Sequence, residues 1–176
     1  MFPSDLNYNL YKDILGKMES NNDYKKVNSI GALCKYQFMT NTLNNLKRIY
    51  DLPAWNYPDY FLDHPELQEQ YENALILDSL TYIDNNHLNT YDGKIISGSI
   101  RFPYITTKLN VYGMLAAIHL SGSSSLNLFL KTGYDDNDGK TSLSDYAAYF
   151  SSKISNNMNF AFLGIAFLGL FLLYYI

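Results

Sequence analysis

Apolar residues recur at helical spacing along most of this chain, and the pattern predicts a mainly α-helical protein. Ser4 and Asp5 are candidate N-caps for a first helix. The apolar face of that helix carries Leu6, Leu10, Ile14, Leu15 and Met18. A second, short helix is predicted from Thr40 to Tyr50, before the turn-rich stretch DLPAWNYPDYFLDHP.

A longer helix is predicted to start near Pro65, because proline is favoured in the first turn of a helix. Its apolar line carries Leu67, Tyr71, Leu75 and Tyr82, with Asp78 as a rim residue. Residues 87–103 predict a loop or a short pair of strands. Helical spacing returns in TTKLNVYGMLAAIHLSG, where Gly122 supplies a stop signal.

Two more helices are predicted in the second half of the chain. One covers Ser124 to Lys131 and ends at Gly133. The other begins at Ser142, where Asp145 follows three residues later in the manner of a capping box. No internal repeat and no strand pattern strong enough for a sheet-based core is present in the sequence. We therefore expect one α-rich domain over residues 1–150.

The last part of the chain has a different character. From Met158 it reads MNFAFLGIAFLGLFLLYYI, without a charged residue. At about 1.5 Å per residue, a helix of this length covers most of a hydrocarbon core of about 30 Å. A buried core helix is the alternative, but such a helix usually carries polar residues on one face. We expect residues 158–176 to form a single transmembrane anchor, joined to the domain by a polar neck at residues 151–157.

Composition narrows the possible functions. The 176 residues carry a formal net charge of −4, which argues against nucleic acid as a partner, because phosphate binding favours a basic face. Cys34 is the only cysteine, so it forms neither an internal disulfide nor a multi-cysteine zinc site. The histidines at 64, 87 and 119 are scattered, and the acidic loop near residue 138 matches a calcium-binding loop only in part. We expect no metal and no cofactor. The first residues have neither the basic nor the apolar region of a signal peptide.

Glu19 is the first candidate for chemistry. A glycosidic bond breaks when a carboxylic acid in a partly apolar setting protonates the leaving oxygen. Glu19 follows directly on the apolar turn of Ile14, Leu15 and Met18. From spacing alone, a glutamate at the end of a helix is more often a solvated surface charge, and Asp23 four residues later more often caps a turn.

Four ordered segments resemble the lysozyme superfamily that includes goose-type lysozymes and lytic transglycosylases. They are MESNNDY (18–24), NSIGALCKYQF (28–38), LAAIHLSG (115–122) and DGKTSLSDY (138–146). A branch in phage and bacterial cell-wall hydrolases has Glu-Ser-Gly-Gly-x-Tyr, then Gly-x-x-Gly-x-Tyr-Gln-Phe. The same branch continues with Ala-Ala-x-His-Leu-x-Gly and Gly-Thr-x-Leu-Ser-Asp-Tyr. The resemblance implies a lysozyme-like helical fold.

The resemblance also implies roles for individual residues. Glu19 would be the general acid and base that cleaves the MurNAc–GlcNAc strand of peptidoglycan. Ser20, Tyr36, Gln37 and His119 would bind the substrate, with His119 at the position of a tyrosine that faces the acid. No second carboxylate is required if the N-acetyl group of the substrate assists. Hydrolysis by water and closure of an anhydro ring by the C6 hydroxyl both remain open.

The sequence departs from this pattern at three glycine positions. Asn21 and Asn22 replace the glycines after Glu-Ser, and asparagine tolerates left-handed backbone angles better than most residues. Cys34 replaces the second glycine of the Gly-x-x-Gly turn. If that position needs a positive φ, the thiol side chain makes it strained. We expect Cys34 to be a small buried residue.

Three functional hypotheses follow from the sequence. In the first, the chain is a membrane-anchored peptidoglycan lytic transglycosylase or muramidase. A hydrophobic segment at the end of the chain favours insertion after synthesis, on the side of the membrane where peptidoglycan is absent. A bacteriophage that carries a membrane in its virion, together with other virion proteins, resolves this conflict, and the enzyme would then open the host cell wall. The second hypothesis is an inactive lysozyme-like structural or assembly protein of such a virus, and the third is an adaptor that binds through its aromatic surface.

Overall fold

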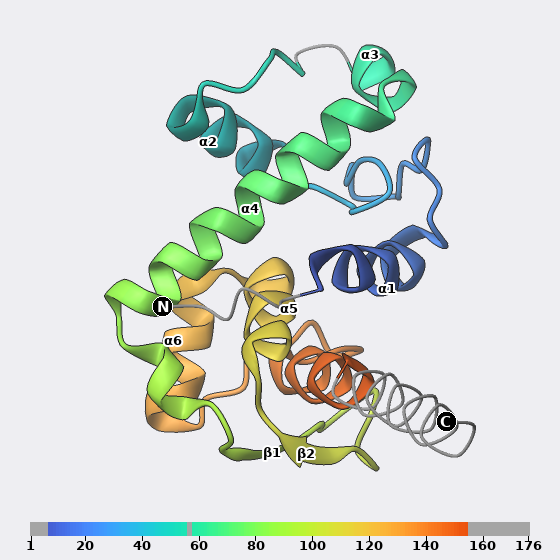
Figure 1. The fold of residues 1–176 in the computed structure, drawn as a ribbon. Helices are drawn as coiled ribbons and strands as arrows, with labels where there is room; N and C mark the ends of the chain where they lie inside the picture. The colour runs from blue at the N-terminus through green and yellow to red at the C-terminus, as the bar shows by residue number, and fades with distance from the viewer. Residues whose placement is uncertain (1–6, 56–57, 155–176) are drawn as a thin grey trace, which may run out of the picture. The chain divides into compact units, whose positions relative to one another are not determined.

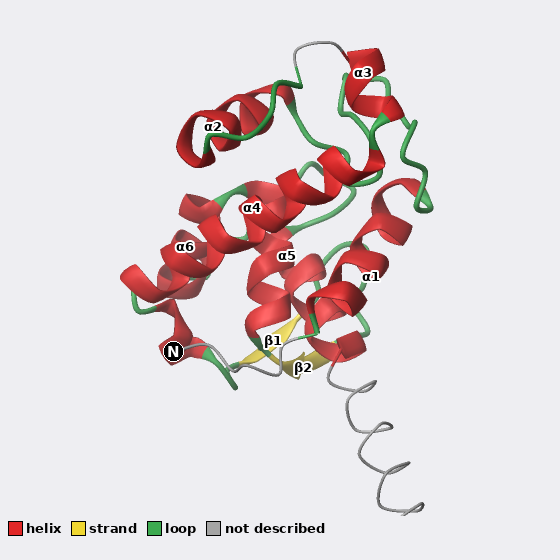
Figure 2. Ribbon diagram, turned by 45° about the horizontal axis from the view of Figure 1, so that its top comes forward, coloured by secondary structure: helices red, strands yellow, loops and turns green. Residues whose placement is uncertain are grey.

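The computed structural model of the chain describes residues 7–55 and 58–154. The described part is mainly helical, as the apolar spacing predicts. Figures 1 and 2 show helices connected by loops, with a sheet of two short strands. The chain divides into two compact units, Met1–His87 and Leu88–Ile176.

The first unit is built from four helices and a long loop. The helices are α1 (Tyr8–Ser20), α2 (Thr40–Tyr50), α3 (Pro58–Asp63) and α4 (Pro65–Asn85). Both α2 and α3 pack against α4 (Figure 1). The loop of residues 21–39 connects α1 to α2 and contains the short backbone pairings of Leu33 with Val27 and with Phe38.

The sequence predicts most of these boundaries correctly. The bounds of α2 match the prediction, and α4 begins at Pro65 with His64 as its N-cap residue. The predicted caps of the first helix are wrong, because α1 begins at Tyr8 and Asn7 caps it. The side-chain oxygen of Asn7 accepts a hydrogen bond from the N–H of Leu10 at 2.9 Å. Helix α3 was not predicted, because its six residues lie inside a stretch rich in turn signals.

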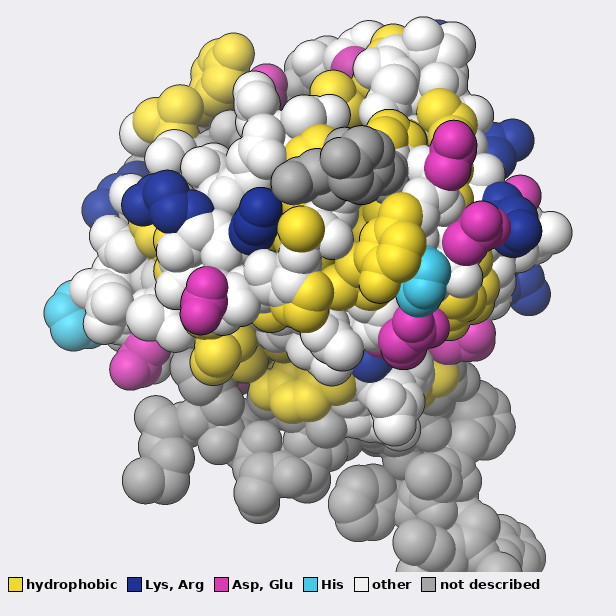
Figure 3. All heavy atoms as spheres, turned by 90° about the horizontal axis from the view of Figure 1, so that it is seen from above, with side chains coloured by type: hydrophobic (Ala, Val, Ile, Leu, Met, Phe, Trp, Pro, Cys, Tyr) yellow, Lys and Arg dark blue, Asp and Glu magenta, His cyan; other side chains and the backbone are white. Residues whose placement is uncertain are grey.

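The core of the first unit is strongly aromatic. The rings of Phe61 and Tyr71 meet edge to face with their centroids 5.5 Å apart, and Trp55 packs on Phe61 at 6.5 Å. The Tyr71 hydroxyl donates a hydrogen bond to the carbonyl oxygen of Pro53 at 2.8 Å, which fixes the chain before α3 to α4. Figure 3 looks onto the face that carries α2 and α3, where apolar side chains lie among charged ones. Ile49 and Tyr60 are among the exposed apolar residues of these helices.

The second unit combines helices with a short hairpin. Its elements are the 3-10 helix η1 (Leu88–Tyr91), strands β1 (Ile95–Ser97) and β2 (Thr106–Lys108), α5 (Val111–Ser121), α6 (Ser123–Thr132) and a helix over residues 143–154. The strands are antiparallel, with Ile96 opposite Thr107. The prediction that TTK opens the next helix is wrong, because these residues form β2. Asn110 caps α5 instead, through a hydrogen bond from the N–H of Gly113 at 3.1 Å.

A close approach between two helices fixes the core of the second unit. Gly113 in α5 faces Ala147 and Ser151 in the helix of residues 143–154. A Cβ at position 113 would overlap the carbonyl oxygen of Ala147 and the hydroxyl of Ser151. The Ser151 hydroxyl also accepts a hydrogen bond from the N–H of Asn110 at 3.1 Å. Glycine at position 113 therefore lets the two helix backbones come close enough for these contacts.

Asp145 organises the start of the helix over residues 143–154. Its carboxylate accepts the N–H of Ser142 at 2.9 Å, and the Ser142 hydroxyl accepts the N–H of Asp145 at 3.1 Å. This reciprocal pair confirms the predicted capping box. The same carboxylate accepts backbone N–H groups of the loop between β1 and β2, at 3.0 Å from Ser99, 2.8 Å from Arg101 and 2.9 Å from Phe102. Although burial alone would raise the pKa of Asp145, these donors lower it to about 2.

We expect Asp145→Asn to destabilise the protein by about 2 kcal/mol at pH 7, because the amide accepts fewer N–H groups and carries no charge. The folded pKa lies below the ordinary value of 3.8. The contribution of the charge is therefore complete above about pH 4 and is lost as the pH falls through about 2. Urea unfolding at pH 7 and at pH 3 checks this, with the exposed Asp92→Asn as the matched control. An equal effect of Asp145→Asn at both pH values would contradict the assignment.

The predicted neck and anchor extend beyond the described residues, since residues 155–176 lie outside them. Within residues 7–55 and 58–154, no helix is long and apolar enough to cross a membrane. The anchor at residues 158–176 therefore stays a prediction from the sequence.

Candidate functional site

Glu19 lies in the last turn of α1 and is half-buried. The helix ends one residue later, at Ser20, because Asn21 takes a left-handed conformation with φ 60°. Asn22 follows with φ 62°. Its side-chain N–H donates to the carboxylate of Asp13 at 3.1 Å, which ties the turn back to α1. The turn expected after Glu-Ser is thus formed with asparagines where the resembling enzymes have glycines.

The loop that follows carries a second tight turn. The N–H and carbonyl groups of Leu33 and Phe38 pair at 2.9 and 2.8 Å, which closes a short hairpin over residues 34–37. Cys34 takes φ 68° and Gln37 takes φ 51° inside it. The Gln37 side-chain amide donates to the carbonyl oxygen of Cys34 at 2.8 Å. Cys34 therefore occupies a backbone conformation that favours glycine, as the departure from the motif implies.

Ser20 and Gly16 hold this loop against α1. The Ser20 hydroxyl donates to the carbonyl oxygen of Lys35 at 2.8 Å and accepts the N–H of Asp23 at 3.0 Å. One turn earlier, a Cβ at Gly16 would overlap the side chains of Lys35 and Asn22. The missing side chain at position 16 thus leaves room for the aliphatic part of Lys35. Together these contacts keep the loop beside the end of α1 that carries Glu19.

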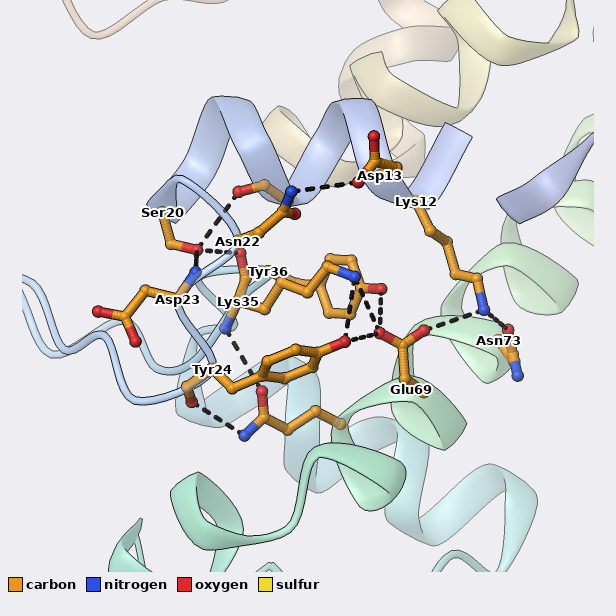
Figure 4. A network of polar contacts seen from close by, with 12 residues as sticks. Lys12, Asp13, Ser20, Asn22, Asp23, Tyr24, Lys35, Tyr36, Glu69 and Asn73 are labelled. Carbon is orange, nitrogen blue, oxygen red and sulfur yellow. Dashed lines mark hydrogen bonds and ion pairs between the residues drawn. The ribbon is translucent and has the colours of Figure 1, made fainter. Parts of the chain in front are cut away.

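A carboxylate on α4 anchors the same loop from the other side (Figure 4). Oε1 of Glu69 accepts hydrogen bonds from the Tyr36 hydroxyl at 2.6 Å, the Tyr24 hydroxyl at 2.9 Å and Nζ of Lys35 at 3.0 Å. Its Oε2 forms an ion pair with Nζ of Lys12, on α1, at 3.0 Å. We call Lys12, Tyr24, Lys35, Tyr36 and Glu69 the Glu69 cluster. It joins α1, the loop and α4.

The side chains of the Glu69 cluster shift one another's pKa values. Burial alone would raise the pKa of Glu69, but the bonds from Tyr36, Lys12, Lys35 and Tyr24 lower it to about 2. Burial and the bond to Glu69 both raise the pKa of the Tyr36 hydroxyl. The carboxylate form of Glu69 and the protonated form of Tyr36 are therefore the stable ones across the physiological pH range.

Glu72 lies one turn further along α4 and is fully buried. Burial is the main cause that raises its pKa well above the usual range, and the carboxylates of Glu69 and Glu19 add to the effect. Two consequences follow. Glu72 favours its neutral acid form, and Glu19 lies within electrostatic reach of α4.

The other residues predicted for the site in the first unit differ in their exposure. Tyr36 is fully buried, and Gln37 is half-buried. Asp23 caps a turn, as predicted, because its carboxylate accepts the N–H of Lys25 at 2.8 Å. Glu19, Ser20, Tyr36 and Gln37 therefore share one region, in which Tyr36 points to Glu69 from inside the protein.

His119 belongs to the second unit. It lies in the last turn of α5 and is half-buried. Gly122 ends this helix with φ 85°, as the sequence predicts. The substrate-binding role of His119 stays a prediction.

Comparisons with known proteins give no relative. No protein-family model, no curated protein and no solved structure matches the chain. The resemblance to the lysozyme superfamily therefore stays a prediction from the sequence motifs.

We expect Cys34 to resist thiol reagents in the folded protein. Its side chain is fully buried, and burial raises the pKa of the thiol to about 12. At pH 8 only about one thiol in ten thousand is then the reactive thiolate. Reaction with a disulfide reagent should proceed at the rate of unfolding, and urea should restore the rate of a free thiol. Rapid labelling without urea would contradict the burial of Cys34.

Metal binding finds no support in this region. In the described part of the chain, no three His, Cys, Asp or Glu side chains lie close enough together to hold a metal ion. The oxygens of Glu69 are occupied by hydrogen-bond donors and a lysine. The carboxylate of Glu69 is therefore arranged to order the loop.

Sequence reasoning did not find Glu69, Gln68 or Lys12. Gln68 is fully buried on α4 and donates to the carbonyl oxygens of Phe61 at 2.8 Å and Tyr24 at 3.0 Å. The polar residues 68, 69 and 72 lie beside the apolar line that the sequence predicted for α4, and two of them, 68 and 72, are fully buried. Two glutamates and a glutamine beside the buried Leu67 and Tyr71 were the available signal, since a helix in contact with a polar loop needs such donors and acceptors.

Proposed function

We propose that the chain cleaves the glycan strand of peptidoglycan, with Glu19 as the general acid and base. The observation that carries the proposal is the backbone at the motif glycines. Gly31 has φ 82°, and positions 21, 22 and 34 have φ between 60° and 68° although they hold no glycine. The backbone is thus left-handed at the positions that correspond to the motif glycines, with asparagine at two of them and cysteine at a third.

In this proposal some side chains react with or contact the glycan, and others hold the loop in position. Glu19 donates its proton to the glycosidic oxygen, and its carboxylate then takes a proton from water or from the C6 hydroxyl that closes an anhydro ring. Gln37 and His119 contact the glycan. Ser20 and the buried Tyr36 act as positioning residues, because their hydroxyls bond to Lys35 and Glu69 and hold the loop beside Glu19. No cofactor and no metal takes part.

We further propose that residues 158–176 anchor the enzyme to a membrane, in particular the virion membrane of a bacteriophage. The support is the uncharged apolar run together with motifs similar to those of phage cell-wall hydrolases. Purified particles that contain the protein and clear peptidoglycan in a gel are the expected result. Absence of the protein from such particles would contradict the location but not the chemistry.

The first test of the chemistry uses the full chain in mild detergent. Incubated with purified cell-wall sacculi, it should lower their turbidity and release soluble glycan fragments. Intact sacculi after prolonged incubation with folded protein would overturn the proposed activity.

The second candidate function is an inactive, membrane-anchored structural or assembly protein. The observation in its favour is the position of Cys34, where a buried side chain stands in a left-handed turn. A protein of this kind should bind sacculi or virion proteins without releasing glycan, and Glu19→Gln should change neither property. Folds do not determine function, so activity on sacculi decides between the two candidates.

A further inference from the structure

The loop between β1 and β2 presents aromatic and cationic side chains beside the helix of residues 143–154. The ring of Phe102 stacks on Tyr149 with 4.7 Å between centroids. Cζ of Arg101 lies 5.2 Å from the centre of the Phe102 ring, and Nζ of Lys153 lies 5.6 Å from that of Tyr149. Tyr104, at the far end of the loop, is 78% exposed. We call Ile100, Arg101, Phe102, Tyr104, Tyr149 and Lys153 the aromatic–cationic surface.

This surface is held rigidly. The Asp145 carboxylate accepts the backbone N–H groups of Ser99, Arg101 and Phe102, so the loop is fixed to the first turn of the helix. Asp135, a second carboxylate, accepts hydrogen bonds from the hydroxyls of Ser99 and Ser144 at 2.8 and 2.7 Å. Both Asp135 and Asp145 are thus occupied by hydrogen bonds inside the unit.

The two cations of this surface have no acidic partner among the described residues. Arg101 and Lys153 are both exposed, and the ion pairs between residues of the described ranges involve other lysines. Ile100, on the same loop, is 40% exposed although it is apolar. Tyr104 is exposed, and Phe102 and Tyr149 are half-buried beneath the cations. An exposed tyrosine and an exposed apolar side chain beside two cations without an acidic partner are typical of proteins at the interface of an anionic membrane.

The position of Lys153 in the chain, shortly before the apolar run, indicates a membrane as the partner of this surface. Lys153 stands five residues before Met158, where the uncharged apolar run begins. The headgroup layer on one side of a bilayer is about 5–8 Å thick. If the run from Met158 enters the hydrocarbon core, the side chains just before it face that layer. Tyrosine is enriched there, and each lysine or arginine near an anionic surface gains about 1 kcal/mol.

We propose that the aromatic–cationic surface docks on acidic phospholipid headgroups at the base of the C-terminal apolar segment. The inference rests on the anchor proposed above and is independent of the chemistry of Glu19. Docking would fix the second unit against the membrane instead of leaving it on a free tether. Tyr104 and Ile100 would enter the interface, while Arg101 and Lys153 would bind the phosphates.

The test places an environment-sensitive dye on the full chain in vesicles. Tyr104→Cys supplies the attachment site, because Cys34 is buried and should stay unlabelled. Leu128→Cys is the matched control, since Leu128 is 45% exposed on α6, which lies across α5 from the helix of residues 143–154 (Figures 1 and 2). Vesicles contain phosphatidylcholine alone or with phosphatidylglycerol, and a headgroup spin label quenches dyes that touch the membrane.

We expect strong quenching at position 104 in vesicles with phosphatidylglycerol, weak quenching without it, and weak quenching at position 128 in both. Arg101→Gln and Lys153→Gln should each lower the docking equilibrium about fivefold, and high salt should do the same. Equal quenching at position 104 in both kinds of vesicle, or none, would overturn the inference. Failure of the chain to float with vesicles would overturn it together with the anchor. Activity on sacculi in detergent tests the proposed function separately, because docking needs no cleavage.

Discussion

Glu19→Gln should reduce the release of glycan from sacculi by about a thousandfold. The proton that a general acid gives to the leaving oxygen accelerates such reactions by about 10² to 10⁴. Glutamine has nearly the same shape but has no proton of this acidity to give. The rate of turbidity loss, measured at equal protein concentration, checks the prediction. The variant should still bind sacculi, because Ser20 and the Glu69 cluster hold the loop in both proteins.

The matched control is Asp23→Asn. Asp23 lies four residues after Glu19, and its carboxylate caps a turn by accepting the N–H of Lys25 at 2.8 Å. Asparagine can make the same bond, so we expect a rate close to that of the wild type. If Glu19→Gln retained full activity, Glu19 would not be the acid. If Asp23→Asn lost as much activity as Glu19→Gln, the two carboxylates would share the chemistry.

Glu69→Gln should lower the free energy of unfolding by about 2 to 3 kcal/mol at pH 7. The substitution leaves Lys35, which is only 8% exposed, and Lys12 without their counter-ion. Breaking a fully buried ion pair costs about 3 to 5 kcal/mol, and the 27% exposure of the Glu69 side chain reduces this figure. Activity should fall as well, because Tyr36 and Lys35 lie in the loop beside Glu19. Denaturant unfolding and the rate of glycan release check the two effects.

The pH dependence distinguishes the charge of Glu69 from its shape. The folded pKa of about 2 lies below the ordinary value of 4.5. The stabilisation is therefore complete above about pH 5 and is lost as the pH falls towards 2, where the wild type should approach the variant. Glu66→Gln, in the exposed first turn of the same helix, is the control and should change little at any pH. A constant difference between wild type and Glu69→Gln from pH 7 to pH 3 would contradict an electrostatic role.

The sequence predicts the helices well where its signals are local. Pro65 marks the start of α4, Gly122 and Gly133 mark the ends of α5 and α6, and the Ser142–Asp145 pair caps the last described helix. The sequence predicts secondary structure less well where tertiary contacts determine it. The two threonines of TTK favour a strand, but the segment is too short to predict one alone, and it forms β2 by pairing with β1. Helix α3 is short and is stabilised by packing against α4.

Some features of the candidate site can also be predicted from the local sequence, and others form only through tertiary contacts. Glu19 at a helix end, the left-handed turn at Asn21 and the burial of Cys34 follow from local sequence and motif. The Glu69 cluster depends on residues 12, 24, 35 and 69, which are distant in the chain and meet only in the folded unit. Tyr36 shows the limit of the motif, because a tyrosine beside Gln37 gives no sign that its hydroxyl bonds to a carboxylate on another helix at 2.6 Å.

We propose above all that this chain breaks the glycan strand of peptidoglycan through Glu19. Mass spectrometry of sacculi digested by the wild type and by Glu19→Gln tests it most directly, because it identifies the bond that is cut. We expect fragments with new muramic acid ends, reducing or anhydro, from the wild type and almost none from the variant. Fragments with new peptide ends only, or the same glycan ends from both proteins, would contradict it.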